Sequence, residues 1–431
     1  MVTSHSRLAT GLLLTLAAMT AGIMSPAARA ADLKTSWKFD FSGKAADGAT
    51  AVKPGDLYSA ANGFGFEPGA AVKVANGAIA ADKPFFFSAA VPEGNYRVKV
   101  TLGGADASDT TIKAELRRLM VEHVHTDAGK PQTVSFIVNV RTPAIVGGGQ
   151  VKLKAPRESV NEAWAWDERI TLEFSNSHPV VSAISIEKVD VPTVYILGDS
   201  TSCDQSGEPF CSWGQMFTNF FKDDIAIANH GESGESVGSA NGAGRFKKIL
   251  AQIKPGDYFI TQFGHNDMKG TPVATYQAGL ESWIDQIKAK GGIPIIVTPM
   301  NRHTFQGNVV TNSLQGFPDA ARAAAKAKGA ALIDLNAMSK TLYEALGPDG
   351  SEAFFEHPAG PNPKYDGTHH SPYGAYELAK CIVQGVKDDK LDLAKHIVDD
   401  FKDFDPAKPD KEADFHVPPT PRVAKETPLG N

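Results

Sequence analysis

The hydrophobic pattern of this chain changes its period at Val191-Pro192, and that change constrains the fold more than any other feature. From residue 36 to about 190, polar and apolar residues alternate in short runs, which is the pattern of strands with one buried face. Beyond it, continuous apolar runs alternate with amphipathic stretches, as in a parallel sheet covered by helices. The sequence therefore predicts an all-β domain followed by an α/β domain.

The first domain, residues 31–190, is expected to be an antiparallel β-sandwich. Glycine-rich turns such as Gly103-Gly104 separate its predicted strands, and no helical stripe of useful length interrupts them. The aromatic run Phe85-Phe86-Phe87 is expected in a buried strand, because exposed aromatics in a row invite aggregation. The alternating runs that predict strands are 95–102, 132–140, 170–174 and 181–189.

The second domain, residues 191–401, is expected to have three α/β/α layers. Its strands should be connected by right-handed crossovers, with chemistry in the loops at their carboxyl ends. The predicted strands are 193–197, 225–228, 258–263, 293–298 and 331–335. The predicted helices are 213–221, 245–253, 276–290, 320–328, 339–346 and 373–386. The proline-rich tail, residues 402–431, has no periodicity and is interpreted as an extended strap or a loose end.

Residues 1–30 have the features of a secretory signal peptide, with cleavage expected after Ala30. The alternative is a membrane anchor, but the apolar run from Leu8 to Met24 is shorter than the roughly 20 residues that a span needs. We therefore expect a secreted or periplasmic protein with no membrane contact after cleavage. Processing would change the formal net charge from −6 to −8, because it removes Arg7 and Arg29. An acidic chain of this kind is not expected to bind nucleic acid, and we expect a monomer.

The three cysteines leave two alternatives open. In an oxidising compartment Cys203 and Cys211 could close a small disulfide loop. Alternatively all three, including Cys381, are free buried thiols. No spacing resembles a zinc site, and no metal or organic cofactor is expected.

Four loops that follow predicted strands carry residues suited to acyl transfer. Such chemistry needs a hydroxyl nucleophile, an imidazole base, a carboxylate that orients the base, and donors for the oxyanion. Ser200 ends the first strand, and Asp366 and His369 lie three residues apart in one loop before the last helix. Gly231 offers an unobstructed backbone N–H, and Asn266 offers a side-chain amide.

These four blocks resemble the SGNH, or GDSL, hydrolases. Within that superfamily the chain is similar to the rhamnogalacturonan acetylesterases over about residues 192–390, in the motifs 196–201, 231–236, 262–267, 298–305 and 366–369. The preceding half resembles, more weakly, a galactose-binding-like jelly-roll sandwich. The resemblance implies a flavodoxin-like hydrolase domain.

The same resemblance implies roles for individual residues. Ser200 would be the nucleophile, His369 the base and Asp366 its partner, with the oxyanion held by Ser200, Gly231 and Asn266. His370 is the rival base, but the Asp-x-x-His spacing selects His369. Arg302 and His265 are candidate substrate-binding residues. Arg302 could equally form a structural salt bridge, and His265 could serve, with Asp267, to shape its loop.

One departure from the family pattern concerns charge. Relatives often carry Arg-Ser-x-Arg-Ser after the second-block glycine, where this chain has Glu232-Ser233-Gly234-Glu235-Ser236. Unpaired carboxylates there would repel an anionic galacturonate backbone. Arg245 and Arg302 are the cations expected to compensate.

The function expected from these residues is a secreted carbohydrate esterase that removes O-acetyl groups from a pectic polysaccharide, rhamnogalacturonan first. The alternatives are an esterase or lipase for other acyl esters, such as acetylated xylan, and an inactive glycan-binding protein. Trp164 and Trp166 would share one face of a strand and could stack on sugars, although a place in the core or at the domain interface is favoured.

Overall fold

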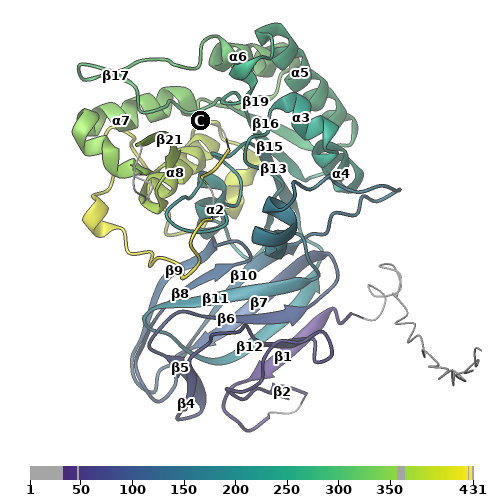
Figure 1. Ribbon diagram of the computed structural model, residues 1–431, viewed down its shortest axis with the longest axis vertical. Helices are drawn as coiled ribbons and strands as arrows, with labels where there is room; N and C mark the ends of the chain where they lie inside the picture. Colours follow the sequence, from purple (N-terminus) through teal and green to yellow (C-terminus); the bar gives the residue numbers. More distant parts are fainter. Residues whose placement is uncertain (1–32, 46–47, 357–364, 426, 430–431) are drawn as a thin grey trace, which may run out of the picture. The chain divides into compact units, whose positions relative to one another are not determined.

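The computed structural model describes residues 33–45, 48–356, 365–425 and 427–429. The expected signal peptide lies outside the described residues. From Lys34 onward the chain forms a single compact unit, in which an all-β region precedes an α/β region (Figure 1).

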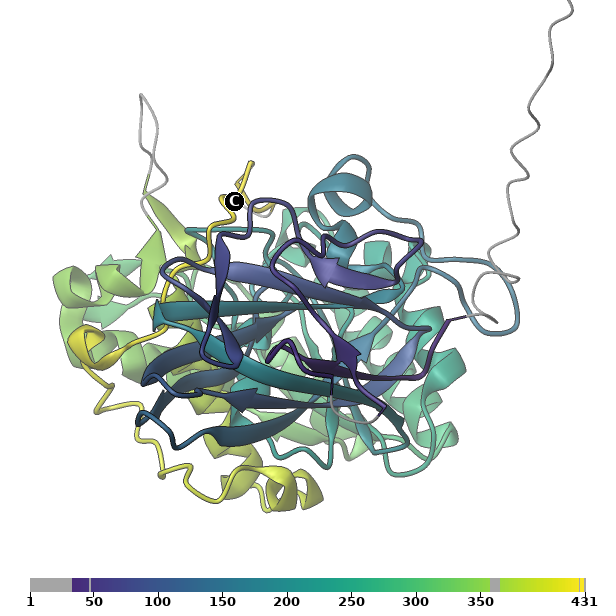
Figure 2. The ribbon, with the colours of Figure 1, turned by 90° about the horizontal axis from the view of Figure 1, so that it is seen from below.

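The β region consists of two sheets packed face to face, seen from below in Figure 2. One core of aromatic and branched side chains lies between them, and in it the rings of Phe39 and Phe87, from opposite sheets, have centroids 5.0 Å apart. The seven-stranded sheet contains β1 (Ser36–Asp40), β2 (Thr50–Ala51), β4 (Val72–Ala75), β5 (Ala78–Ala81), β7 (Gly94–Leu102), β10 (Gln132–Val140) and β12 (Val180–Val189). The five-stranded sheet contains β3 (Phe64–Phe66), β6 (Phe85–Ala90), β8 (Ser108–Ala114), β9 (Arg118–Thr126) and β11 (Arg169–His178).

This region confirms the predicted antiparallel β-rich half, and Phe85-Phe86-Phe87 does lie in a largely buried strand. Trp164 and Trp166 are not on a strand, because a short 3-10 helix spans Ala163–Ala165. Trp166 is buried, and the ring of Trp164 lies under the guanidinium of Arg422 at 4.1 Å. Both tryptophans therefore belong to the interior and the interface, as favoured from the sequence.

The α/β region is built on a five-stranded parallel sheet with strand order β14-β13-β15-β16-β19. Its strands are β13 (Thr193–Gly198), β14 (Ala226–Asn229), β15 (Tyr258–Gln262), β16 (Ile293–Val297) and β19 (Ala331–Ile333). This order is that of flavodoxin-like folds, whose ligands bind where the strand order reverses, beside the first strand. Here the first strand is β13, and Ser200 lies two residues after its last residue, Gly198.

Helices cover both faces of this sheet, which confirms the three predicted layers (Figure 1). One face packs against α3 (Val237–Gly242), α4 (Arg245–Gln252), α5 (Val273–Ala289) and α6 (Phe317–Lys328). The other packs against α2 (Trp213–Phe217), α7 (Leu335–Ser351) and α8 (Pro372–Asp388). The sequence did not predict α3 or the hairpin of β17 (Phe305–Gln306) and β18 (Val309–Val310), since such short elements carry little periodicity.

The described part of the tail is a strap rather than a loose end. Lys113 Nζ of β8 donates to the carbonyl of Pro418 at 2.6 Å, and the Thr420 hydroxyl donates to Glu173 of β11 at 2.7 Å. Ala424 N donates to the carbonyl of Glu208 in the α/β region. The tail thus joins both regions.

Candidate active site

Ser200 lies in a tight turn immediately after β13. The N–H groups of Ser202 and Cys203 both donate to the carbonyl of Asp199, at 3.1 and 3.0 Å. A side chain at Gly198 would place its Cβ 2.1 Å from Ser202 Oγ and 2.6 Å from the Gln262 carbonyl. Only glycine therefore allows the strand to turn here and present the Ser200 hydroxyl.

His369 and Asp366 lie on β21 (Asp366–His370), which pairs with β20 (Phe355–Glu356). The prediction that this segment is a loop is wrong, because the pairing gives it strand geometry. His369 Nε2 is 2.9 Å from Ser200 Oγ, and His369 Nδ1 is 2.7 Å from Asp366 Oδ2. The structure therefore joins the three predicted residues in one hydrogen-bonded chain.

The Asp366 carboxylate is fixed by its own strand. Its Oδ1 accepts hydrogen bonds from the N–H groups of Thr368 and His369, both at 3.0 Å. The other oxygen is thereby directed at the imidazole. Ser200, Asp366 and His369 are all at most 3% exposed, so water screens their interactions weakly.

His370 faces away from Ser200 into the core. Its Nε2 is 3.0 Å from the hydroxyl of Tyr343. Burial, together with the neighbouring His369 and His265, lowers the pKa of His370 to about 3. This side chain therefore stays neutral and belongs to the packing of α7.

The three expected oxyanion donors differ in their surroundings. Ser200 N–H has no hydrogen-bond acceptor among the described residues. Gly231 N–H is not unobstructed as expected, because it donates to Asn229 Oδ1 at 3.1 Å. Asn266 Nδ2 uses one hydrogen on the carbonyl of Glu235, at 3.0 Å, and an amide nitrogen carries a second one.

Asn229, at the end of β14, is a site residue to which the sequence assigned no role. Its Nδ2 donates to the carbonyl of Ser202 at 2.8 Å and to Asp204 Oδ1 at 2.9 Å. It therefore ties the Gly231 N–H to the turn that carries Ser200. The only signal in the sequence was an asparagine at a strand end two residues before the glycine.

The contacts of His265 fit the loop-shaping alternative, and its role in substrate binding stays a prediction. His265 is fully buried, and its Nδ1 is 3.5 Å from Asp199 Oδ2. Burial alone would raise the pKa of Asp199, but His265 and hydrogen bonds from Thr201 outweigh burial and lower it. The pair holds the first and third loops together.

Arg302 is partly exposed beside this pair. Its Nη2 lies 3.4 Å from the His265 carbonyl. Burial lowers the pKa of Arg302, and the charges of Asp199 and Asp366 oppose that shift. Arg302 thus remains a cation at the edge of the site, where it could meet a substrate.

Glu232 and Glu235 do not face the site as unpaired charges, contrary to expectation. Both are buried. Glu232 Oε1 is 3.4 Å from Arg157 Nε, and Glu235 Oε1 is 2.9 Å from Lys154 Nζ. The two cations come from the segment before β11, so the β region supplies a cationic partner to each of these carboxyl groups. Arg245 is likewise buried, paired with Glu158, and cannot meet a substrate.

All three cysteines are free and buried. Cys203 Sγ lies 3.6 Å from the Ser233 hydroxyl, whereas Cys211 Sγ lies 3.8 Å from the Ser212 carbonyl. Because the two sulfur atoms have different surroundings, the structure has free thiols rather than the Cys203–Cys211 disulfide.

Among the described residues, no group of three or more histidine, cysteine, aspartate or glutamate side chains is arranged to hold a metal ion. No helix in the described part of the chain is long and apolar enough to cross a bilayer.

A parallel α/β domain with a serine, a histidine and an aspartate in one hydrogen-bonded chain at its strand ends defines a serine-dependent acyl hydrolase. Residues 196–375 match the GDSL-like lipase/acylhydrolase family, and the chain belongs to that family. It is an SGNH esterase, a carboxylic-ester hydrolase.

Several known proteins are similar to this chain. Rhamnogalacturonan acetylesterase RhgT of Bacillus subtilis is 39% identical over 217 residues, which are 48% of this chain and 94% of the relative. The uncharacterized esterase YxiM of the same organism is 28% identical over 374 residues, 81% of this chain and 90% of the relative. The crystal structure of YxiM covers 83% of this chain and 99% of its own at 25% identity, with a TM-score of 0.46.

Proposed function

We propose that this protein is an O-acetylesterase of acidic plant polysaccharides, with acetylated rhamnogalacturonan as its first substrate. The observation that carries the proposal is the hydrogen-bonded chain from Ser200 Oγ through His369 to Asp366. The choice of substrate is supported by the 39% identity to a protein named as a rhamnogalacturonan acetylesterase.

The first half of the reaction follows from this geometry. Asp366 holds the Nδ1–H tautomer of His369, so Nε2 is free to take the Ser200 proton. Ser200 Oγ then bonds to the acetyl carbon, and the carbonyl oxygen becomes an oxyanion. Its donors would be the N–H groups of Ser200 and Gly231 and the Asn266 amide.

The second half regenerates the enzyme. The bond between the acetyl carbon and the sugar oxygen breaks, and the sugar hydroxyl leaves with the proton from His369 Nε2. A water molecule, deprotonated by the same nitrogen, attacks the acetyl-Ser200 ester, and acetate departs as Ser200 recovers its proton.

The roles follow the same chain of contacts. Ser200 is the nucleophile, His369 the general base and acid, and Asp366 its orienting partner. Gly231 N–H must turn from Asn229 Oδ1, or share its proton with the oxyanion, when substrate binds. Arg302, a partly exposed cation beside the site, would pair with a uronate carboxylate.

The test is acetate release from acetylated rhamnogalacturonan, acetylated homogalacturonan and acetylated xylan side by side, with Ser200→Ala as the blank. We expect the highest kcat/KM on rhamnogalacturonan. A preference for xylan would identify the first alternative, an esterase for other acetylated polymers. With nitrophenyl esters of increasing acyl chain length, kcat/KM should decline beyond acetate. A higher kcat/KM on acyl chains above four carbons would indicate a lipase.

Export is part of the proposal, because the polymer lies outside the cell. Residues 1–30 have the sequence features of a signal peptide. Sequencing the N-terminus of the protein recovered from its host should show a chain that begins at Ala31. A chain that still begins at Met1 would contradict export by cleavage.

A further inference from the structure

A buried ion-pair cluster joins the β region to the loop that carries Gly231. Its centre is Arg157, on the turn Arg157–Asn161 before β11. The Nε of Arg157 is 3.0 Å from Glu162 Oε1 and 3.4 Å from Glu232 Oε1. Their side chains are 6%, 3% and 4% exposed. Glu232 follows Gly231 directly, so this contact acts on the backbone of an oxyanion donor.

A second set of contacts reaches the other donor. Lys154 Nζ pairs with Glu235 Oε1 at 2.9 Å and also donates to the carbonyl of Ser233. The carbonyl of Glu235 accepts the hydrogen bond from Asn266 Nδ2. Two of the three oxyanion donors are therefore attached to a loop whose buried carboxyl groups contact Arg157 and Lys154 from outside the α/β region, while Glu235 also lies 3.7 Å from Arg245 of α4.

We propose that Arg157 and Lys154 are positioning residues of the esterase: they hold loop 231–236 so that Gly231 N–H and Asn266 Nδ2 converge on the oxyanion. This inference rests on the proposed function. Without Arg157, the buried carboxyl group of Glu232 would lose its cationic partner, and without Lys154, Glu235 would keep only Arg245, whose Nε is 3.7 Å from Glu235 Oε1. The loop would then move to bring these groups toward water. The β region would then be part of the catalytic unit and not only a separate binding module.

The test compares kcat per titrated active site in the full-length chain, with nitrophenyl acetate as substrate and a fluorophosphonate as titrant. Arg157→Met and Lys154→Met should each lower kcat about 10- to 100-fold, with KM changed less than about threefold, since misaligned donors act on the transition state. Arg157→Lys should recover part of the loss because it keeps the charge.

The matched control is Lys248→Met. Lys248 Nζ is also a buried cation paired across the regions, at 2.7 Å from Glu93 Oε1, but it touches neither Ser233 nor Glu235. Its kcat per site should equal that of the wild type. The proposal is overturned if Arg157→Met and Lys154→Met keep kcat per site, or if Lys248→Met loses as much. A wild type inactive on every ester would instead contradict the proposed function.

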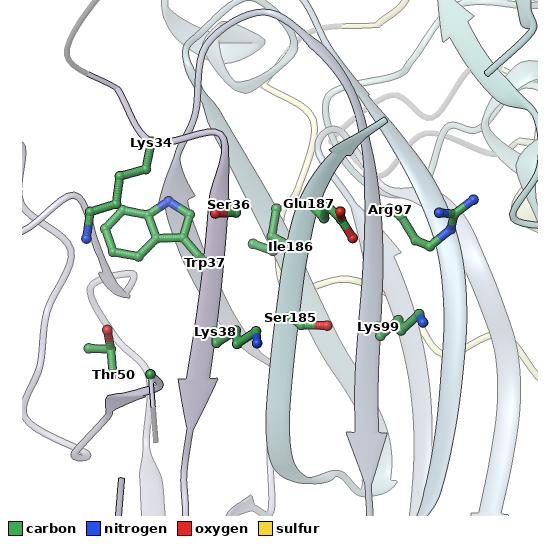
Figure 3. A pocket seen from close by; sticks show the side chains of 11 residues that line it. Lys34, Ser36, Trp37, Lys38, Thr50, Arg97, Lys99, Ser185, Ile186 and Glu187 are labelled. Atoms are coloured by element: carbon green, nitrogen blue, oxygen red, sulfur yellow. The ribbon is translucent and has the colours of Figure 1, made fainter. Parts of the chain in front are cut away.

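A trough lies on the outer face of the seven-stranded sheet (Figure 3). Its volume is about 460 Å³. Lys38 on β1 pairs in register with Ser185 on β12, and Ser185 pairs with Lys99 on β7. Neighbouring strands lie about 4.8 Å apart, so the two lysines stand roughly 10 Å apart with a small hydroxyl side chain between them.

The trough is cationic within an acidic chain. Lys34, Lys38, Arg97 and Lys99 line it, with Glu187 as the carboxylate among its lining residues. Arg97 is paired with Asp223 at 3.3 Å. Among the described residues Lys38 and Lys99 have no acidic partner within ion-pair distance. The indole of Trp37, which also lines the trough, is buried with its Nε1 bonded to the Ala90 carbonyl, so it offers no stacking platform for a neutral sugar.

We infer that this trough binds the uronate carboxylates of an acidic polysaccharide and so holds the polymer near the esterase domain. The inference deepens the proposed function and rests on it. Two unpaired lysines at a fixed spacing favour a ligand with repeated negative charges, and such binding weakens with salt.

Affinity electrophoresis of the full chain carrying Ser200→Ala tests this, in gels containing polygalacturonate or a neutral galactomannan. Polygalacturonate should retard the protein, and Lys38→Glu/Lys99→Glu should abolish the retardation. The control Lys247→Glu/Lys290→Glu makes the same charge change at exposed lysines elsewhere. This variant should still be retarded by polygalacturonate. Equal loss of retardation in both double variants, or equal retardation by galactomannan, would overturn the inference that the trough binds uronate carboxylates. Retardation without acetate release from pectic polymers would contradict the proposed function alone.

Discussion

The hydroxyl of Ser200 and the imidazole of His369 lie 169 residues apart in the chain, yet Ser200 Oγ is 2.9 Å from His369 Nε2. The contact exists because the turn after β13 and the β20–β21 hairpin meet in the folded α/β region. With Asp366 at 2.7 Å from the other ring nitrogen, the imidazole has one orientation in which both bonds form.

Substitutions in the hydrogen-bonded chain of Ser200, His369 and Asp366 should distinguish the roles of its residues. Ser200→Ala removes the nucleophile and should lower kcat by about 10⁴-fold or more. Asp366→Asn keeps the size but favours the wrong tautomer of His369, so we expect a loss of roughly 10³- to 10⁴-fold. Steady-state hydrolysis of nitrophenyl acetate measures both. An Asp366→Asn enzyme with wild-type kcat would contradict the orienting role.

His370→Gln should affect stability and not chemistry. The change breaks a buried hydrogen bond with the Tyr343 hydroxyl and should lower the free energy of unfolding by about 1–3 kcal/mol. Because His370 does not touch Ser200, kcat per titrated site should stay within about twofold of the wild-type value. Urea denaturation and active-site titration give the two values, and a large drop in kcat per site would identify His370 as the base.

The strand-end residues of the site were predictable because the carboxyl ends of parallel strands converge, which places Ser200 and Asn266 near each other once the strands are known. The roles of Arg157 and Lys154 were not predictable, because no local sequence pattern connects these residues to Glu232 and Glu235. The two glutamates look like exposed substrate-facing charges in the sequence, and only tertiary structure shows their partners. The buried state of His265 was hidden for the same reason.

Reduction should leave the fold unchanged, because the three cysteines are free and buried. Burial raises the pKa of the Cys203 thiol well above its ordinary value, which also makes it unreactive. An aromatic disulfide reagent should therefore label no thiol in the native protein and three in urea. The thermal midpoint should be the same with and without dithiothreitol, whereas a fall with dithiothreitol would indicate a disulfide.

Glu232 tolerates a neutral side chain better than a basic one. Burial and the nearby Glu162 and Glu158 raise the pKa of Glu232 well above its usual range, so glutamine resembles its protonated form. Glu232→Gln should change the free energy of unfolding by less than about 1 kcal/mol. Glu232→Arg puts a second cation beside Arg157 and should cost about 3–5 kcal/mol. Urea denaturation compares the two, and equal losses of stability would show that the added positive charge is not what destabilises Glu232→Arg.

Asp267 should make the free energy of unfolding depend on pH. Burial raises the pKa of this carboxyl to about 7, whereas an unfolded aspartate ionises near pH 4 (about 3.9). Between these values the unfolded chain releases a proton that the folded protein retains, so this group lowers the stability as pH rises, by at most about 1.4 kcal/mol per pH unit. Asp267→Asn keeps an oxygen for the Val237 N–H, which donates to Asp267 Oδ1 at 3.1 Å, and removes the titration. The stability of Asp267→Asn relative to wild type should therefore rise from pH 5 to about 7 and be constant above about 8. Urea denaturation of both proteins across that range measures the difference, and a difference independent of pH would show that Asp267 is ionised throughout.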